Sequence, residues 1–398
     1  MIFLFSFFLG LAFFPLMGIF LLLDRKASET TETMAASTIN TRFTNLFKCK
    51  HPILLPGMSW ISNPELVASV SNAGGVGILA TGPLNAQETR QAIHKIRTLT
   101  DKPFGIGATL LMPGAKENAQ VALEEQVPII NVSLGKAEWI AEGLSGYGGK
   151  LLATVTNPIH AKAALNAGAD ALMVTGHEAA AHGGDVTSLV LIPAFRRRFP
   201  DVPIVAAGGF ATGSGLAGAL ALGADGVAMG SRMAVTKESP LAEATKLAIV
   251  NANEQETVYG SNFDGIPARV LKTPMADSAM TKRPPLPVIA YRAFQAAHQM
   301  NIPLWKVLPG LLTQFNSMFT IAQFGAATSA CQAATVDGDL EKGVQFIGQC
   351  QGMIDDIPVV EELVQRIIKE AKDTHTYQNT LFDVEDEDHE NSFKIDAS

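Results

Sequence analysis

From Pro52 onward, short apolar runs alternate with longer segments of helical periodicity about every 20–25 residues. The apolar runs are continuous rather than alternating, which is typical of parallel strands covered on both faces. Strands are predicted at residues 53–57, 75–80, 104–109, 129–133, 150–155, 170–175, 203–207 and 225–229. Helices are predicted between them at residues 63–72, 86–98, 115–126, 136–144, 158–167, 187–198 and 212–222. This order predicts an α/β fold, a closed (β/α)8 TIM barrel over residues 46–236, with an open doubly wound sheet as the alternative.

The strand rhythm ends before residue 237. Residues 237–350 contain longer helical stretches, at 239–253, 287–300 and 303–331, and predict a mostly helical lid domain over the barrel mouth. Residues 351–372 include apolar positions at helical spacing and predict a C-terminal helix that packs on the barrel. Residues 373–398 are acidic and poor in apolar side chains, which predicts a disordered tail.

The first 23 residues carry no charged side chain and are long enough to cross a bilayer core as a helix. A signal peptide would have a basic start and a shorter apolar core. We therefore expect a membrane anchor at 1–23, with Arg25 and Lys26 keeping the rest of the chain in the cytosol. Residues 24–45 are expected to be a polar linker. The alternative is that translation starts at Met34, which would give a cytoplasmic protein without the anchor.

Composition, charge and the absence of certain motifs exclude several classes of function. The chain has 398 residues and a formal net charge of −8, which argues against non-specific nucleic-acid binding. Its three cysteines have no CxxC spacing, which excludes a disulfide scaffold and a cysteine zinc site. The sequence contains no P-loop, no GxSxG and no GxGxxG in a dinucleotide-binding context. Nucleotide hydrolysis and a dedicated dinucleotide domain are therefore not expected.

Two glycine turns follow the last two predicted strands. Gly208 and Gly209 come after the seventh strand, and Gly230 and Ser231 come after the eighth. In a barrel these loops lie side by side, and backbone N–H groups at helix starts bind phosphate. The two turns therefore predict a phosphate site, whereas either of them alone could be only a tight turn.

The loop after the sixth strand, residues 175–185, combines small residues with two histidines. A histidine at a strand end can exchange a proton near neutral pH, and His182 is the candidate. His177 is interpreted as structural. A metal site is not expected, because the HEAAAH spacing differs from HExxH and does not put both histidines on one helical face.

These segments together resemble the nitronate monooxygenase family, formerly called 2-nitropropane dioxygenases, and the related flavin-dependent enoyl-ACP reductases. The resemblance covers residues 45–370. The matching segments are PILLPGMSW (52–60), SNAGGVGILA (71–80), HEAAAHGG (177–184), the block 202–232 and IGQCQGMIDDIPVVEELV (347–364).

The resemblance implies an FMN-binding barrel with a helical lid, in which His182 acts as a base or orients the substrate. The cofactor-binding residues that it implies are Gly57, Met58, Asn72, Thr175, Ala180, Gly208, Gly209, Ala228, Met229, Gly230 and Ser231. The chain departs from the family pattern at three positions. Thr175 stands where the family commonly has glutamine, and Ala180 and Ala181 stand where it commonly has two glycines.

The activity implied by the resemblance is FMN-dependent oxidation of small alkyl nitronates or nitroalkanes with O2, giving carbonyl compounds and nitrite. The first alternative is an NAD(P)H-dependent flavin reductase of the enoyl-ACP reductase type. The second is a tethered binding protein that has kept the phosphate site but lost turnover. The sequence does not identify the natural substrate or the oligomeric state.

Overall fold

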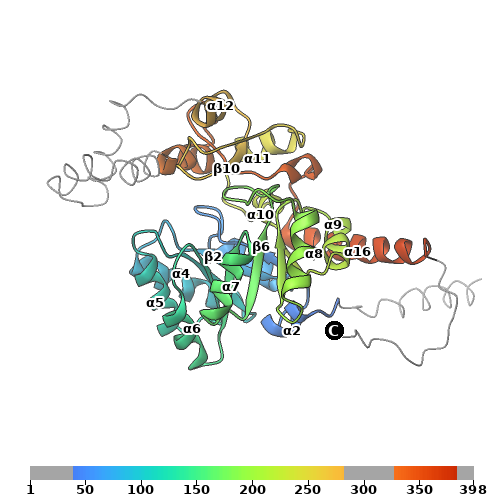
Figure 1. Cartoon of the computed structure of the whole chain (residues 1–398). Helices are drawn as coiled ribbons and strands as arrows, with labels where there is room; N and C mark the ends of the chain where they lie inside the picture. Colours follow the sequence, from blue (N-terminus) through green and yellow to red (C-terminus); the bar gives the residue numbers. More distant parts are fainter. Residues whose placement is uncertain (1–38, 282–326, 383–398) are drawn as a thin grey trace, which may run out of the picture. The chain divides into compact units, whose positions relative to one another are not determined.

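The computed structural model describes residues 39–281 and 327–382. Eight parallel strands close into a barrel in sequence order, because β1 pairs with both β2 and β8 (Figure 1). The strands are β1 Ile53–Leu55, β2 Val76–Ala80, β3 Phe104–Thr109, β4 Ile129–Ser133, β5 Lys150–Val155, β6 Ala171–Thr175, β7 Ile204–Ala207 and β8 Gly226–Ala228. The predicted TIM barrel is therefore confirmed, and the open-sheet alternative is excluded.

Seven helices lie between consecutive strands. They are α3 Pro64–Asn72, α4 Ala86–Leu99, α5 Ala115–Glu124, α6 Glu138–Ser145, α7 Pro158–Asn166, α8 Ser188–Arg198 and α9 Gly213–Ala221. Several begin at side-chain caps, in which Asn63, Asn85 and Asn157 each accept a hydrogen bond from the backbone N–H three residues on. These caps explain why the predicted helix starts agree with the structure to within two residues.

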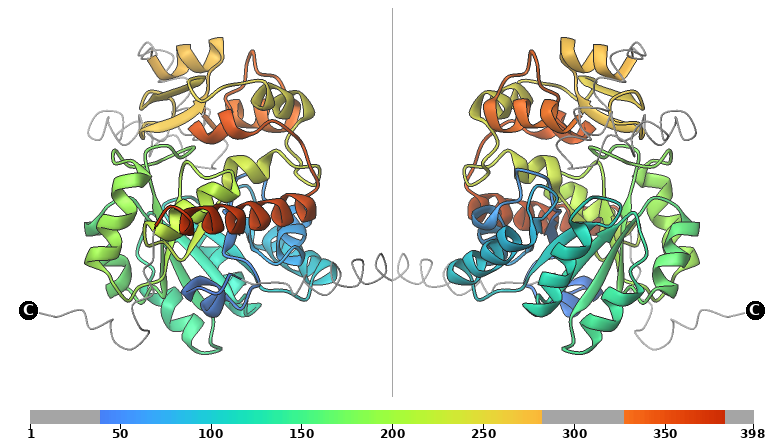
Figure 2. Two further views of the ribbon diagram at one scale, coloured as in Figure 1. Left: turned by 90° about the vertical axis from the view of Figure 1, so that its right-hand side faces the viewer. Right: turned by 90° about the vertical axis from the view of Figure 1, so that its left-hand side faces the viewer.

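The helix α16, Val360–Asn379, completes the helical ring of the barrel. It packs along α9 and also contacts α3, so it lies where a helix directly following β8 would be expected (Figure 2). The approach to α9 is close, since a Cβ on Gly213 would lie 2.2 Å from the Ile367 carbonyl oxygen. The C-terminal helix predicted within residues 351–372 is thus present, but it begins at Val360 and extends to Asn379. The predicted disordered tail is wrong for residues 373–379, which are helical.

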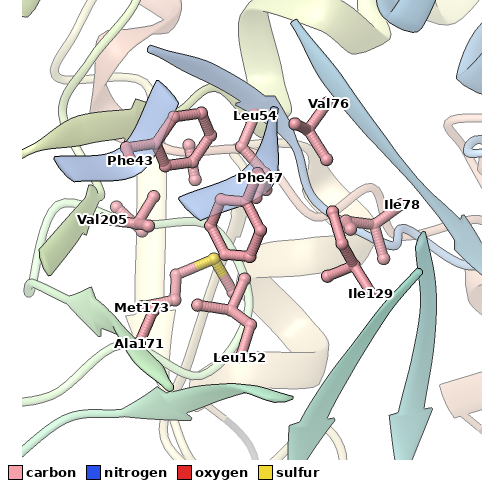
Figure 3. Packing of buried hydrophobic residues seen from close by; sticks show 12 residues of the cluster. Phe43, Phe47, Leu54, Val76, Ile78, Ile129, Leu152, Ala171, Met173 and Val205 are labelled. Carbon is pink, nitrogen blue, oxygen red and sulfur yellow. The ribbon is translucent and has the colours of Figure 1, made fainter. Parts of the chain in front are cut away.

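The short helix α2, Arg42–Phe47, packs under the amino-terminal end of the barrel. The rings of Phe43 and Phe47 pack edge to face, with their centres 5.0 Å apart. They belong to the same core cluster as residues of several strands, among them Leu54, Val76 and Ile129 (Figure 3). Phe43 is completely buried. The predicted polar linker over 24–45 is therefore wrong for residues 42–45, because these residues are helical and the Phe43 ring among them is removed from water.

After β8 the chain forms a segment that we call the cap, residues 235–358, of which 282–326 are not described. It follows the short helix α10, Gly230–Ala234. Its elements are α11 Glu243–Val250, β9 Thr257–Gly260, β10 Ala268–Leu271, α12 Pro274–Thr281, helical residues 327–332, η1 Ala333–Asp337 and η2 Gln349–Met353.

The predicted helical character of this region is present in the structure, together with an antiparallel pair, β9 and β10, that the sequence pattern did not indicate. The predicted helix at 287–300 and most of the one at 303–331 lie outside the described residues.

Residues 1–23, for which the sequence predicts a membrane anchor, also lie outside the described residues. In the part of the chain that the structure describes, every helix is too short or too polar to cross a bilayer.

Candidate functional site

The carboxyl ends of the barrel strands bring the predicted site loops to one rim. The β6 loop, residues 176–187, the β7 turn and the start of α10 lie on three neighbouring strands, since β6 pairs with β7 and β7 with β8. The cap contacts this rim, because Gln349 N–H donates to the Glu178 carbonyl at 3.0 Å. This is the end of a barrel that normally carries chemistry.

The β7 turn needs glycine for its conformation. Gly208 and Gly209 have φ values of 97° and 87°, a left-handed region that side chains rarely adopt. A Cβ on Gly208 would lie 3.0 Å from the Ala179 nitrogen of the β6 loop. The turn therefore packs directly against the loop that carries His182.

The helix α10 starts at Gly230, immediately after β8, without a side-chain cap. Among the described residues, no hydrogen bond uses the backbone N–H groups of Gly209, Gly230 or Ser231 as donors. Ser231 does accept a bond at its Oγ from the Gly348 N–H, at 3.0 Å. Unpaired N–H groups on two adjacent turns are the donor set that a phosphate requires.

The amino terminus of α9 does not share in this donor set. Glu370 of α16 accepts hydrogen bonds from Gly213 N–H at 2.9 Å and Ser214 N–H at 3.1 Å, and Thr212 accepts one from Gly215 N–H. Of the two helix starts expected to face a phosphate, the one after the first turn is therefore already occupied by Glu370. In the first turn, the available donors are those of the turn itself.

The β1 loop lies beside α10. A Cβ on Gly230 would lie 3.3 Å from the Met58 sulfur and 3.4 Å from Pro56. Gly57 is in turn close to β3, since a Cβ on Gly107 would lie 3.8 Å from the Gly57 Cα atom. Small residues thus line this side of the rim, and a flat ring system could approach the backbone there.

His182 is held by a carboxylate from the cap. Its Nε2 donates to Asp264 Oδ2 at 2.7 Å, and its ring lies 6.0 Å from that of Phe346. The Asp264 side chain is 2% exposed, whereas that of His182 is 31% exposed. The imidazole is therefore anchored on one side and accessible on the other.

His177 has a different environment. Its Nδ1 lies 3.1 Å from the Gly184 carbonyl oxygen, and its ring packs edge to face on Tyr259 at 4.6 Å. Its own carbonyl accepts hydrogen bonds from the buried Arg269, whose guanidinium lies 5.2 Å from the Tyr259 ring centre. Burial lowers the pKa of Arg269. These contacts tie the β6 loop to the β9–β10 pair and agree with a structural role for His177.

The structure brings most of the predicted residues together at this rim. Those at the carboxyl ends of β1, β6, β7 and β8 or in the loops that follow these strands are Gly57, Met58, Thr175, Ala180, His182, Gly208, Gly209, Ala228, Met229, Gly230 and Ser231. Thr175, Ala228 and Met229 are buried, so they support the loops more than they present side chains.

Asn72 is the exception, and its assignment to the cofactor site is wrong. It is the last residue of α3 and precedes β2, which puts it at the amino-terminal end of the barrel strands. Its exposed side chain donates to the Leu99 carbonyl and accepts from the Thr100 hydroxyl. A loop that enters a strand lies at the opposite end of the barrel from the loops that leave the strands.

Sequence reasoning missed three residues at the rim. Asp264 follows Phe263 in a turn of the cap, and nothing in the local pattern links it to His182, which is 82 positions earlier. Gly348 lies in the matching segment 347–364, and a Cβ there would lie 2.9 Å from the Glu178 carbonyl oxygen. The Glu178 carboxylate accepts the Ser188 N–H at 2.9 Å and so fixes the β6 loop to the start of α8.

Comparisons with known proteins agree with this geometry. The family model described as nitronate monooxygenase matches residues 40–370. A relative from Rhodococcus jostii, named as a (3aS,4S,5R,7aS)-5-hydroxy-7a-methyl-1-oxo-octahydro-1H-indene-4-carboxyl-CoA dehydrogenase, is 34% identical over 84% of this chain and 96% of its own length.

Two solved structures are similar over most of the chain. FabK from Thermotoga maritima is 34% identical, with a TM-score of 0.73, covering 87% of this chain and 100% of that one. A nitroalkane oxidase from Streptomyces ansochromogenes is 25% identical, with a TM-score of 0.69, covering 84% of this chain and 99% of that one.

Proposed function

This chain belongs to the nitronate monooxygenase family, and we propose that it binds FMN at the barrel rim and oxidises alkyl nitronates or nitroalkanes with O2 to carbonyl compounds and nitrite. Like its relatives it is an oxidoreductase. The observation that carries the proposal is the pair of adjacent turns at Gly209 and Gly230, whose N–H groups have no partner among the described residues.

The residues present fit a flavin mononucleotide. The phosphate would be held by the N–H groups of Gly209, Gly230 and Ser231, which need an acceptor. The ring would lie against the β1 loop at Gly57, which itself carries no side chain. When bound, FMN would accept electrons from the substrate and react with O2. The protein supplies position, charge and exclusion of water.

His182 supplies the acid–base chemistry in this proposal. A neutral nitroalkane becomes oxidisable once a proton leaves the carbon next to the nitro group, and an imidazole near neutral pH can accept that proton. The bond to Asp264 stabilises the imidazolium that forms. His182 therefore acts on the substrate rather than on the cofactor.

Replacing this histidine tests its role. His182→Ala is expected to retain FMN and to lose about 10²–10⁴-fold in turnover of a neutral nitroalkane, the usual contribution of a general base. His375→Ala, at an exposed position on α16, is the control and should keep full turnover. Steady-state rates and the visible spectrum give the two readouts. Unchanged turnover in His182→Ala would refute the assignment.

A second candidate function is favoured by the relatives. The Rhodococcus jostii protein acts, by its name, on a CoA thioester, and FabK is as similar to this chain over a comparable span. A thioester also acidifies the carbon next to its carbonyl, so the same histidine could serve there. This candidate includes the NAD(P)H-dependent reductase of the enoyl-ACP type.

Anaerobic flavin bleaching separates the candidates. The full-length chain is reconstituted with FMN and mixed in turn with ethylnitronate, with NADH or NADPH, and with an acyl-CoA. Bleaching by nitronate alone supports the first function, and bleaching by pyridine nucleotide or by acyl-CoA supports the second. A chain that binds FMN but is bleached by none of them would support a binding protein without turnover. A folded chain that cannot be reconstituted with flavin would end both proposals.

For residues 1–23 we keep the prediction of a membrane anchor with the catalytic part in the cytosol. The test is fractionation of cells that express the full chain, with a chain that begins at Met34 as the control. We expect only the full chain to remain in carbonate-washed membranes. A full chain recovered entirely in the supernatant would contradict the anchor and favour the cytoplasmic alternative.

A further inference from the structure

The Asp264 carboxylate makes two directed contacts. One oxygen, Oδ2, accepts the Nε2–H of His182 at 2.7 Å, and the other, Oδ1, accepts the backbone N–H of Ile266 at 3.1 Å. Its side chain is only 2% exposed, so it has little access to water. The Ile266 N–H fixes which oxygen faces the histidine.

The backbone next to His182 is also fixed to the cap. Ala181 forms an isolated antiparallel bridge with Arg269 of β10, in which each residue donates its N–H to the carbonyl of the other, at 3.2 and 3.1 Å. Ala181 has a φ of 54°, a left-handed conformation that an alanine adopts only when its surroundings impose it. The histidine is thus held by the cap at its backbone and at its ring.

We propose that Asp264 is a positioning residue that keeps the proton of neutral His182 on Nε2, so that Nδ1 carries the lone pair that meets the substrate. A carboxylate can only accept, so the ring nitrogen that faces it must be the donor. The other nitrogen is then the base. The proposal deepens the function proposed above and rests on it for its catalytic consequence, but not for the position of the proton.

The step balances without a further reactant. The C–H bond next to the nitro group breaks, its electron pair stays on the substrate as the nitronate, and the proton forms a bond to Nδ1. The imidazolium then carries a proton on each nitrogen and remains bonded to the Asp264 carboxylate. A substrate supplied as the preformed nitronate does not need this step.

Asp264→Asn is the sharpest variant because it changes one atom. Its amide oxygen can still accept the Ile266 N–H, which leaves the amide NH2 facing His182. An NH2 group can only donate, so Nε2 would become the acceptor and the proton would move to Nδ1. The lone pair would then point at the amide instead of at the substrate.

The position of the proton can be measured without turnover. The FMN-loaded full-length chain is labelled with ¹⁵N-histidine, and the His182 resonances are identified by their loss in His182→Ala. We expect the Nε2–H form in the wild type and the Nδ1–H form in Asp264→Asn. Asp277→Asn, an acidic position elsewhere in the cap, should keep the wild-type pattern. A wild type with the proton on Nδ1, or an Asp264→Asn variant with an unchanged pattern, would overturn the proposal.

The kinetic consequence distinguishes positioning from a general loss of structure. In Asp264→Asn, kcat/KM is expected to fall at least 100-fold for a neutral nitroalkane and less than threefold for the preformed nitronate. Equal losses on both substrates, or no loss on either, would overturn the catalytic role of the proton position. If the wild type oxidises neither substrate while the ¹⁵N pattern is as expected, the proposed function fails and the assignment of the proton stands.

Discussion

At the residue scale, the site depends on a turn that only glycine adopts without strain. Gly208 combines a φ of 97° with a Cβ position 3.0 Å from the Ala179 nitrogen, so an alanine would be strained and would also push the β6 loop. We expect Gly208→Ala to lower the free energy of unfolding by about 1–3 kcal/mol and to weaken FMN binding at least tenfold.

Gly218 in α9 provides the matched control. A Cβ there meets nothing within 4 Å, and the residue lies inside a helix. Gly218→Ala should therefore raise the free energy of unfolding by about 0.5–1 kcal/mol and leave FMN binding unchanged. Denaturant unfolding and fluorescence titration with FMN give both quantities. Equal behaviour of the two variants would show that the β7 turn has no special role.

The two alanines of the β6 loop give a second matched pair. Only Ala181 has a positive φ, at 54°, and this left-handed conformation costs an alanine roughly 1 kcal/mol. In Ala181→Gly, relief of that strain should offset the greater freedom of the unfolded chain. Ala180 has no such strain to relieve, so Ala180→Gly should lower the free energy of unfolding by about 0.4–1 kcal/mol. Denaturant midpoints measure the difference, and an equal loss in both variants would contradict the strain at Ala181.

These residues also indicate how far sequence reasoning reaches. Gly208, Gly230 and His182 were predictable because each lies in the loop or turn that follows an apolar strand, and barrel topology places the carboxyl ends of the strands together. The same rule would have excluded Asn72, which precedes its strand. Asp264 was not predictable, because its contact with His182 depends on how the cap folds onto the rim.

At the element scale, α16 acts as both the eighth barrel helix and the cap of α9. The Glu370 carboxylate accepts the first two N–H groups of α9. Burial alone would raise the pKa of Glu370, but the hydrogen bonds from Gly213 and Ser214 outweigh it and leave that pKa below its ordinary value. The charged form is therefore favoured in the folded chain more than in the unfolded chain.

Replacing Glu370 should consequently cost stability only where the carboxylate is ionised. We expect Glu370→Gln to lose about 1 kcal/mol at pH 7. A lowered folded pKa contributes stability above the unfolded pKa, and that contribution disappears as the pH falls through the folded value. The difference in stability between the two chains should therefore shrink as the pH falls below the ordinary range of a glutamate and vanish once the carboxylate is protonated in the folded chain. Glu362→Gln, an exposed position on the same helix, is the control, and a pH-independent loss in Glu370→Gln would refute the capping role.

The hydrophobic pattern of the sequence predicted some strands and helices better than others. The barrel strands were predicted within two residues, because a strand buried on both faces is a continuous apolar run. The pair β9 and β10 was missed, since β9 is only half-buried and has no apolar run. The last turns of α16 were missed because residues 373–379 share the polar composition of the tail, although Ala371 before them is buried.

At the scale of the whole molecule, the cap is fastened to the barrel where the cofactor is proposed to bind. The bonds from Gly348 to Ser231, from Gln349 to Glu178 and from His182 to Asp264 all join the cap to the β6 loop or to α10. An ion pair adds to them, since the buried Arg232 of α10 donates to the partly exposed Asp356 at 3.0 Å. A ligand that orders this rim should therefore stabilise the barrel and the cap together.

This coupling allows the phosphate site to be tested by comparing FMN with riboflavin, which has the same ring system but no phosphate. FMN at 100 times its dissociation constant should stabilise the chain by about 2.7 kcal/mol. Each hydrogen bond to a charged group contributes about 1.5–3 kcal/mol, so without the three bonds proposed for the phosphate, riboflavin at the same concentration should be mostly unbound. We expect a rise of several degrees in Tm with FMN and less than one degree with riboflavin, measured by calorimetry on the full chain. Gly208→Ala should reduce the FMN effect, whereas Gly218→Ala should keep it. Equal stabilisation by both flavins would mean that the N–H groups of Gly209, Gly230 and Ser231 do not hold the phosphate.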